Sequence, residues 1–153
     1  MAVYFFDSSA LVKRYAQETG SEWILALTEP AAGHSLYIAR ITAVEVVSAL
    51  TRRRRGGSVS EIDATTAMAA FRHDLFHQYR VIEITPTVIT RAMALAETHG
   101  LRGYDAVQLA SALIVQAMRE TLGLSALELA SADRELNDAA AVEDLTIDDP
   151  NSR

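Results

Sequence analysis

Cysteine is absent from this chain of 153 residues. Its absence excludes disulfide bonds, zinc–thiolate sites and a cysteine nucleophile, and it fits a reducing compartment. No stretch of about 18 uncharged apolar residues is present, so we expect no transmembrane helix. The first apolar run lacks a preceding basic region and stops at Asp7, which predicts a strand and not a signal peptide. We therefore expect a cytoplasmic protein.

Basic residues are outnumbered, with 14 lysines and arginines against 20 acids, so the net charge is −6. A dedicated nucleic-acid-binding module is usually basic, and this balance disfavours that class. An enzyme can still handle nucleic acid briefly, because its acids can hold metal ions that attract phosphate. The chain also lacks the G-x-x-x-x-G-K, G-x-G-x-x-G and G-x-S-x-G motifs, so nucleotide-binding and serine-hydrolase functions have no support.

What is present is an alternation of short apolar strands and helices, without repeats or long linkers. Half of the residues are hydrophobic, enough for one folded domain over 1–147, followed by a polar and frayed tail over 148–153. The alternation predicts an α/β fold with a mostly parallel sheet. We expect strands near 2–6, 35–39, 81–84, 126–130 and 142–147. We expect helices near 9–15, 21–28, 43–54, 58–78, 85–99, 104–122 and 133–140.

Two acids follow predicted strands. Asp7 comes directly after the first strand, and Asp133 comes three residues after the fourth. Ligands of open α/β sheets bind beyond the carboxyl ends of strands, which favours a functional site. Asp is also a common N-cap, so either residue could instead cap the helix that follows. Ser8 or Ser9 could cap the first helix equally well.

Two further acids stand near predicted helix starts. Glu45 lies on or beside the apolar face that begins at Ile41, but Thr42-x-x-Glu45 is also a capping-box pattern. Asp105 shares a helix face with Leu109 and Leu113, at i, i+4 and i+8. An unpaired charge pointing inward is costly, and a metal ion or cation would compensate it. The alternative is a first-turn acid that complements the helix dipole.

A metal site needs these acids to converge. Two helices separate the third and fourth strands, so Asp105 reaches the same sheet edge only if the Gly100–Gly103 loop carries the chain back. Converging carboxylates raise one another's pKa values, and a divalent cation offsets the repulsion. Mg²⁺ prefers hard oxygen ligands and can support in-line displacement at a phosphodiester.

The acids lie in motifs that resemble the PIN-domain family, and within it the VapC-type ribonuclease toxins of toxin–antitoxin pairs. The matching segments, in the family's order, are Phe6-Asp7-Ser8-Ser9-Ala10-Leu11-Val12-Lys13, Thr42-Ala43-Val44-Glu45, Gly103-Tyr104-Asp105-Ala106-Val107-Gln108-Leu109-Ala110 and Ser131-Ala132-Asp133-Arg134-Glu135-Leu136. The resemblance implies a three-layer α/β/α domain with a central, mostly parallel five-stranded sheet. It implies a metal-dependent endoribonuclease whose metal-activated water cleaves RNA.

The resemblance also implies a set of ligands and partners. Asp7 and Asp105 would be the main ligands of Mg²⁺ or Mn²⁺, and Glu45 and Asp133 would complete the acidic, catalytic pocket. Ser9 stands where the family often has a small polar residue. A homodimer and a cognate antitoxin that blocks the pocket are further implications.

Other readings remain open at this point. A haloacid-dehalogenase-like hydrolase needs a D-x-D motif, but Ser9 occupies its second position. A non-enzymatic alternative is a receiver-like module or a catalytically inactive PIN-like module. Trp23 and Tyr37 are interpreted as core or interface residues, and the four histidines as packing or surface residues. We expect solvated surface at Glu128, Asp138, Asp144, Asp148 and Asp149.

The single basic run, Arg52–Arg55, also has two interpretations. Cations at a helix C-terminus complement the dipole. Alternatively, the run forms a patch for RNA phosphates or for an acidic antitoxin segment. Lys13 and Arg14 would join this patch if their helix lies close.

Overall fold

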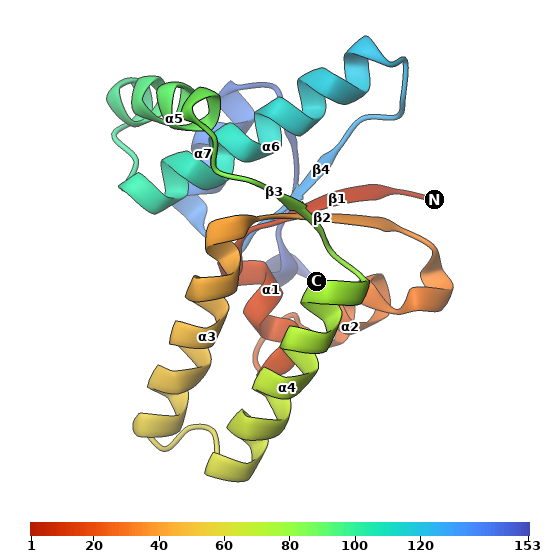
Figure 1. Ribbon diagram of the computed structural model, residues 1–153, viewed down its shortest axis with the longest axis vertical. Helices are drawn as coiled ribbons and strands as arrows, with labels where there is room; N and C mark the ends of the chain where they lie inside the picture. The colour runs from red at the N-terminus through yellow and green to blue at the C-terminus, as the bar shows by residue number, and fades with distance from the viewer.

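A five-stranded parallel sheet runs through the middle of the computed structural model, which describes residues 1–153 (Figure 1). The strand order is β3-β2-β1-β4-β5. The strands are β1 (Val3–Phe6), β2 (Ser35–Ala39), β3 (Arg80–Ile82), β4 (Glu128–Ala130) and β5 (Thr146–Asp148). The α/β prediction with a parallel, five-stranded sheet is confirmed.

Helices cover both faces of the sheet and give three layers (Figure 1). One face carries α1 (Ser8–Tyr15), α2 (Ser21–Thr28), α3 (Arg40–Arg55) and α4 (Glu61–His77). The other carries α5 (Pro86–His99), α6 (Gly103–Thr121) and α7 (Arg134–Val142). Strand β1 is buried along its whole length, with Val3 and Phe5 in one core and Tyr4 and Phe6 in the other. A strand that is apolar on both faces is typical of a covered parallel sheet.

The connection between α5 and α6 decides where Asp105 lies. Gly100 ends α5 with a φ of 66°, a left-handed conformation that glycine adopts without a Cβ penalty. After this turn, α6 starts near the carboxyl ends of the strands and runs back across the sheet (Figure 1). The loop therefore brings the chain back to the edge of the sheet formed by the carboxyl ends of the strands, as the metal-site hypothesis required.

Two predicted helix starts are wrong. Strand β2 leads directly into α3, which begins at Arg40 without a side-chain cap. Thr42 and Glu45 therefore lie inside the helix, and the capping-box interpretation of Glu45 fails. Helix α4 begins at Glu61, where the Ser60 hydroxyl accepts a hydrogen bond from the Asp63 amide at 3.1 Å, so Ser58 is not the cap.

The C-terminal residues are ordered and not frayed. Asp148 ends β5, is 6% exposed and forms an ion pair with Arg153, which contradicts its expected place on the solvated surface. Pro150–Ser152 form a short 3₁₀ helix. The Arg153 guanidinium lies 5.1 Å from the centre of the Trp23 ring. The tail thus packs against the domain through charge and cation–π contacts.

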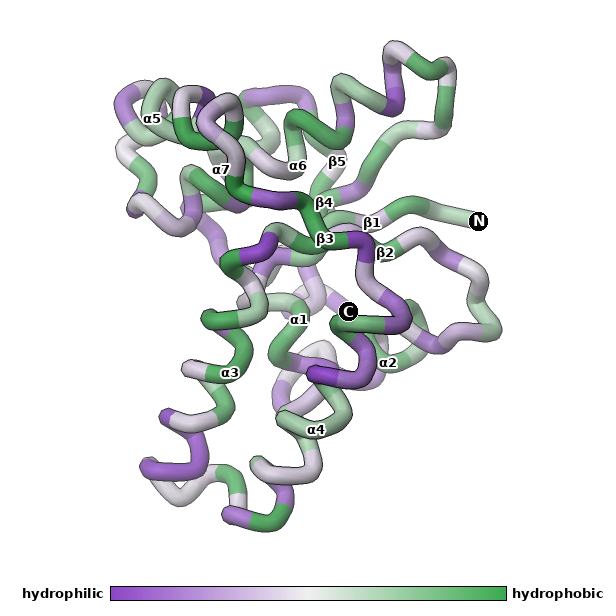
Figure 2. The backbone as a smooth tube through the Cα atoms, viewed as in Figure 1, coloured by the Kyte–Doolittle hydropathy of each residue, from purple (hydrophilic) through white to green (hydrophobic).

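The hydropathy pattern agrees with this burial. Figure 2 shows hydrophobic residues along β1 and a hydrophilic stretch at the lower end of α3. That stretch is the basic last turn of α3, Arg52–Arg55, so these cations lie at a helix C-terminus, where they complement the dipole. No helix here combines the length and the apolar character that crossing a membrane requires.

Candidate active site

Asp7 lies at the carboxyl end of β1 and is 3% exposed. Its carboxylate caps α1 by accepting a hydrogen bond from the Ala10 amide at 3.0 Å, so the N-cap hypothesis is confirmed. The Ser9 hydroxyl lies 2.7 and 2.8 Å from the two carboxylate oxygens, and the Ser131 hydroxyl donates to Oδ2 at 3.0 Å. Burial raises the pKa of Asp7 to about 7, although these hydrogen bonds oppose the shift.

Asp133 begins α7 on the neighbouring strand connection. Its carboxylate accepts from the Leu136 amide at 3.1 Å, which confirms a second N-cap. The Ser131 hydroxyl accepts from the Asp133 amide at 3.1 Å, and the Ser9 hydroxyl accepts from the Ala132 amide at 2.9 Å. These hydroxyls therefore hold Asp7 and the loop of Asp133 in a fixed relation.

Asp105 is the third residue of α6 and is half-buried. Burial, together with the negative charges of Asp133 and Glu45, raises its pKa to about 6. The Arg102 guanidinium opposes that shift, and Glu135 adds to it. Glu45 on α3 and Asp133 before α7 therefore lie close enough to Asp105 to raise its pKa. The negative charges of these three acids are concentrated at one edge of the sheet.

Glu45 is linked to α6 through Gln108, which is 1% exposed. The Gln108 Nε2 atom donates to Glu45 Oε1 at 2.7 Å and to Thr42 Oγ1 at 2.8 Å. Its Oε1 atom is buried without a partner. Gln108 thus fixes the carboxylate of α3 relative to the helix that carries Asp105.

The four predicted acids lie at one end of the sheet, but their carboxylates are not arranged as a coordination sphere. No three Asp, Glu or His side chains stand at the spacing of a coordination sphere. The Ser9 hydroxyl lies within hydrogen-bond distance of both Asp7 carboxylate oxygens. Oδ1 also accepts from the Ala10 amide, and Oδ2 also accepts from the Ser131 hydroxyl. The donor set nevertheless fits a hard divalent cation, because it consists of carboxylates whose charges destabilise one another.

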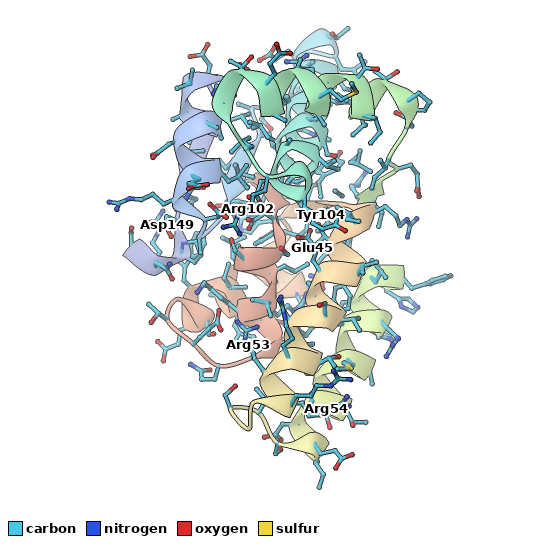
Figure 3. The ribbon with its side chains drawn as sticks, turned by 90° about the vertical axis from the view of Figure 1, so that its left-hand side faces the viewer. Glu45, Arg53, Arg54, Arg102, Tyr104 and Asp149 are labelled. Carbon is cyan, nitrogen blue, oxygen red and sulfur yellow. The ribbon has the colours of Figure 1, made fainter.

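A cleft of about 470 Å³ opens between α1 and α3, and Glu45 is the one of the four acids that lines it. It is lined by Ser8, Ser9, Val12, Ile41, Val44, Glu45, Ser48, Ala49, Arg52, Arg53 and Tyr104. Glu45 and Tyr104 line this cleft together, and Figure 3 shows Arg53 and Arg54 further along α3. The cleft therefore leads from the acidic sheet edge to the basic end of α3.

The basic residues near the cleft have different partners. Glu18 accepts from Lys13 at 3.2 Å and from Arg53 at 2.9 Å, so Lys13 does lie close to the basic run. Arg14 instead donates to Tyr79 at 2.6 Å and to Gln78, and it does not join the run. Arg52 is exposed at the cleft.

Sequence reasoning did not single out Arg102, Tyr104 or Gln108. Gln108 stands three residues after Asp105, so the helical period put it near the same face and gave a usable signal. Arg102 and Tyr104 lie on either side of Gly103 at the helix start. Their proximity to Glu45 depends on how α6 approaches α3, which no local pattern encodes.

Residues 4–142 match the PIN domain. The chain therefore belongs to the PIN-domain family. Within that family it is of the VapC ribonuclease type: it is 37% identical over 115 residues to "Ribonuclease VapC45" of Mycobacterium tuberculosis, covering 75% of this chain and 78% of that protein. The suggested family resemblance is confirmed.

Solved structures support the fold. PAE2754 from Pyrobaculum aerophilum matches with a TM-score of 0.62 at 24% identity, over 99% of this chain and 85% of that one. A chain of a toxin–antitoxin complex from Klebsiella pneumoniae matches with a TM-score of 0.58 at 20% identity, over 87% of each chain. The receiver-like alternative is wrong, because receivers have the strand order 2-1-3-4-5.

Proposed function

We propose that this protein is a metal-dependent endoribonuclease and the toxin of a toxin–antitoxin pair. The observation that carries the proposal is the gathering of Asp7, Glu45, Asp105 and Asp133, from separate segments, at the carboxyl edge of one parallel sheet. Membership of the VapC ribonuclease group supports the same activity. The substrate class is RNA, and the reaction is hydrolysis of its phosphodiester bonds.

Asp7 and Asp105 are the proposed principal ligands of Mg²⁺ or Mn²⁺, and Glu45 and Asp133 complete the pocket. A cation bound there lowers the pKa of water and stabilises negative charge on the phosphodiester. Ser9 and Ser131 orient the Asp7 carboxylate, and Gln108 orients that of Glu45. Because Asp7 and Asp105 have raised pKa values, binding of an ion would displace the fraction of protons that they still hold.

We also propose a cognate antitoxin, a homodimer and a cytoplasmic site of action. Support for the antitoxin comes from a structural relative that was solved as a toxin–antitoxin complex, that from Klebsiella pneumoniae. The cleft beside the acids offers a place where such a partner would block access.

The test is cleavage of RNA by purified Asp7→Asn and Asp105→Asn proteins in Mg²⁺ or Mn²⁺. Each neutral amide removes one anionic ligand and keeps the shape of the side chain, so we expect cleavage to fall by at least about 100-fold. Circular dichroism checks that each variant is folded. Asp138→Asn, at an exposed position of α7, is the matched control and should cleave normally.

Chelation with EDTA must abolish cleavage by the unmodified protein. Full activity of either Asp7→Asn or Asp105→Asn would refute the proposal. RNA binding by the unmodified protein, with no cleavage in either metal, would instead support an inactive PIN-like binding module.

A further inference from the structure

Tyr104 is an exposed aromatic residue that belongs to neither hydrophobic core. The chain has ten aromatic residues, four Phe, five Tyr and one Trp, and only Phe76 and Tyr104 are strongly exposed, at 88% and 62%. Tyr37 is buried, and Trp23 packs edge-on against Tyr4 with ring centres 6.5 Å apart. The expectation that Trp23 and Tyr37 are packing residues is confirmed.

The place of Tyr104 is specific. It is the residue before Asp105, and its side chain lines the cleft together with Ser9 and Glu45 (Figure 3). Val44, 66% exposed, lines the same cleft. A flat, accessible ring therefore stands on the wall of the cleft beside the acids. Phe76, in contrast, lies near the end of α4 and lines no part of this cleft.

The charges around the ring match a polyanion. Arg102, exposed and two residues before Tyr104, lies near the acids, since its charge lowers the pKa of Asp105. Arg52 is exposed at the far part of the cleft. Single-stranded nucleic acid binds where bases stack on aromatic rings and cations follow the backbone. In a duplex the base faces are already stacked and are not free to meet such a ring.

We propose that Tyr104 is a stacking platform for an unpaired nucleobase next to the phosphodiester that is cleaved. The residue then determines specificity, because it selects single-stranded or looped RNA over duplex RNA. This inference rests on the proposed function, since it places RNA in the cleft beside the carboxylates. A protein segment on the same ring is the competing occupant, since its acidic side chains would pair with Arg52 and Arg102, and the experiment separates the two.

The experiment uses short single-stranded RNAs that each carry one 2-aminopurine, moved along the sequence, in Ca²⁺ to supply a cation with oxygen preference. Stacking on tyrosine quenches 2-aminopurine fluorescence. The unmodified protein should quench at one position and bind the matching duplex more weakly. Tyr104→Phe keeps the ring and should bind within about twofold, whereas Tyr104→Ala and Tyr104→Leu should lose the quenching and about tenfold in affinity.

Phe76→Ala is the control for loss of an exposed aromatic side chain and should leave both readouts unchanged. Unchanged quenching and affinity in folded Tyr104→Ala and Tyr104→Leu would overturn the inference. So would variants that bind RNA normally and lose affinity only for an antitoxin-derived peptide. Quenching that depends on Tyr104 without any cleavage in Mg²⁺ or Mn²⁺ would support stacking while the proposed function fails. Normal cleavage with no effect at Tyr104 would reject stacking alone.

Discussion

Asp7 combines a structural role and a proposed catalytic role that conflict energetically. As the N-cap of α1 it stabilises the helix, and as a buried carboxylate it carries a charge that the interior disfavours. Local sequence rules offered the cap as one of two roles for Asp7, because a cap needs only residues 7–10. They could not quantify the cost of the charge, since the contacts from Ser131 and the influence of Asp133 come from the distant β4–α7 connection.

This conflict predicts that Asp7→Asn stabilises the metal-free protein at high pH. The folded-state pKa of Asp7 is raised from 3.8 to about 7, so the folded protein binds its proton more tightly than the unfolded chain. Its contribution to stability is full below the unfolded pKa and is lost as pH rises through about 7. At about pH 8, Asp7→Asn should raise the free energy of unfolding by about 2 kcal/mol, and the gain should disappear near pH 4.

Urea unfolding in EDTA at both pH values measures this difference, with Asp138→Asn as the neutralised but exposed control. Added Mg²⁺ should stabilise the unmodified protein more than the variant, because only the former keeps the full carboxylate set. A variant that is less stable than the unmodified protein at both pH values would contradict the argument.

At the scale of elements, strands and helices could be predicted from the sequence where a strand-like or helical pattern of apolar residues ends at a clear turn or capping signal. Strand β1 and the start of α5 are examples. The start of α3 was misplaced because β2 enters it without turn residues, and this error made a capping-box role look like an alternative for Glu45. The metal-site hypothesis required Asp105 to lie near Glu45, but the sequence could not show that it does. The path from α5 to α6, which decides this, is set by tertiary packing.

The ordered tail gives a prediction with a matched control. Gly20 and Gly100 both have positive φ, 85° and 66°. A Cβ at Gly20 would lie 2.3 Å from the Pro150 carbonyl oxygen, whereas one at Gly100 meets nothing within 4 Å. Gly100→Ala should therefore cost about 1 kcal/mol from its backbone conformation, and Gly20→Ala at least about 2 kcal/mol.

Chemical denaturation of both variants tests the difference. Removing residues 149–153 should bring the cost of Gly20→Ala down to that of Gly100→Ala, since the clash is with the tail. Equal costs in the full-length chain would show that the tail does not pack against Gly20.

At the scale of the whole molecule, a net charge of −6 opposes RNA, and the local distribution of charge must compensate. The acids are at the sheet edge, where a cation would neutralise them. Of the arginines near the cleft, Arg53 is paired with Glu18, whereas Arg52 is exposed. Composition alone disfavoured nucleic acid. It is the arrangement of α3 and α6 around the cleft that makes an acidic protein compatible with an RNA substrate.

This arrangement predicts a shallow salt dependence of RNA binding. Each phosphate neutralised on a single strand contributes a slope of about −0.7 in log affinity against log salt concentration. With Arg102 near Asp105 and Arg52 at the far part of the cleft as the two exposed cations, we expect a slope of about −1.4, and Arg52→Ala should make it shallower by about 0.7. Fluorescence titrations at fixed Ca²⁺ and increasing KCl measure the slope. Arg91→Ala, on α5 and outside the cleft, should leave it unchanged. An equal change in both variants would mean that RNA responds to the overall charge of the protein and not to the cleft, because Arg52 lines the cleft and Arg91 does not.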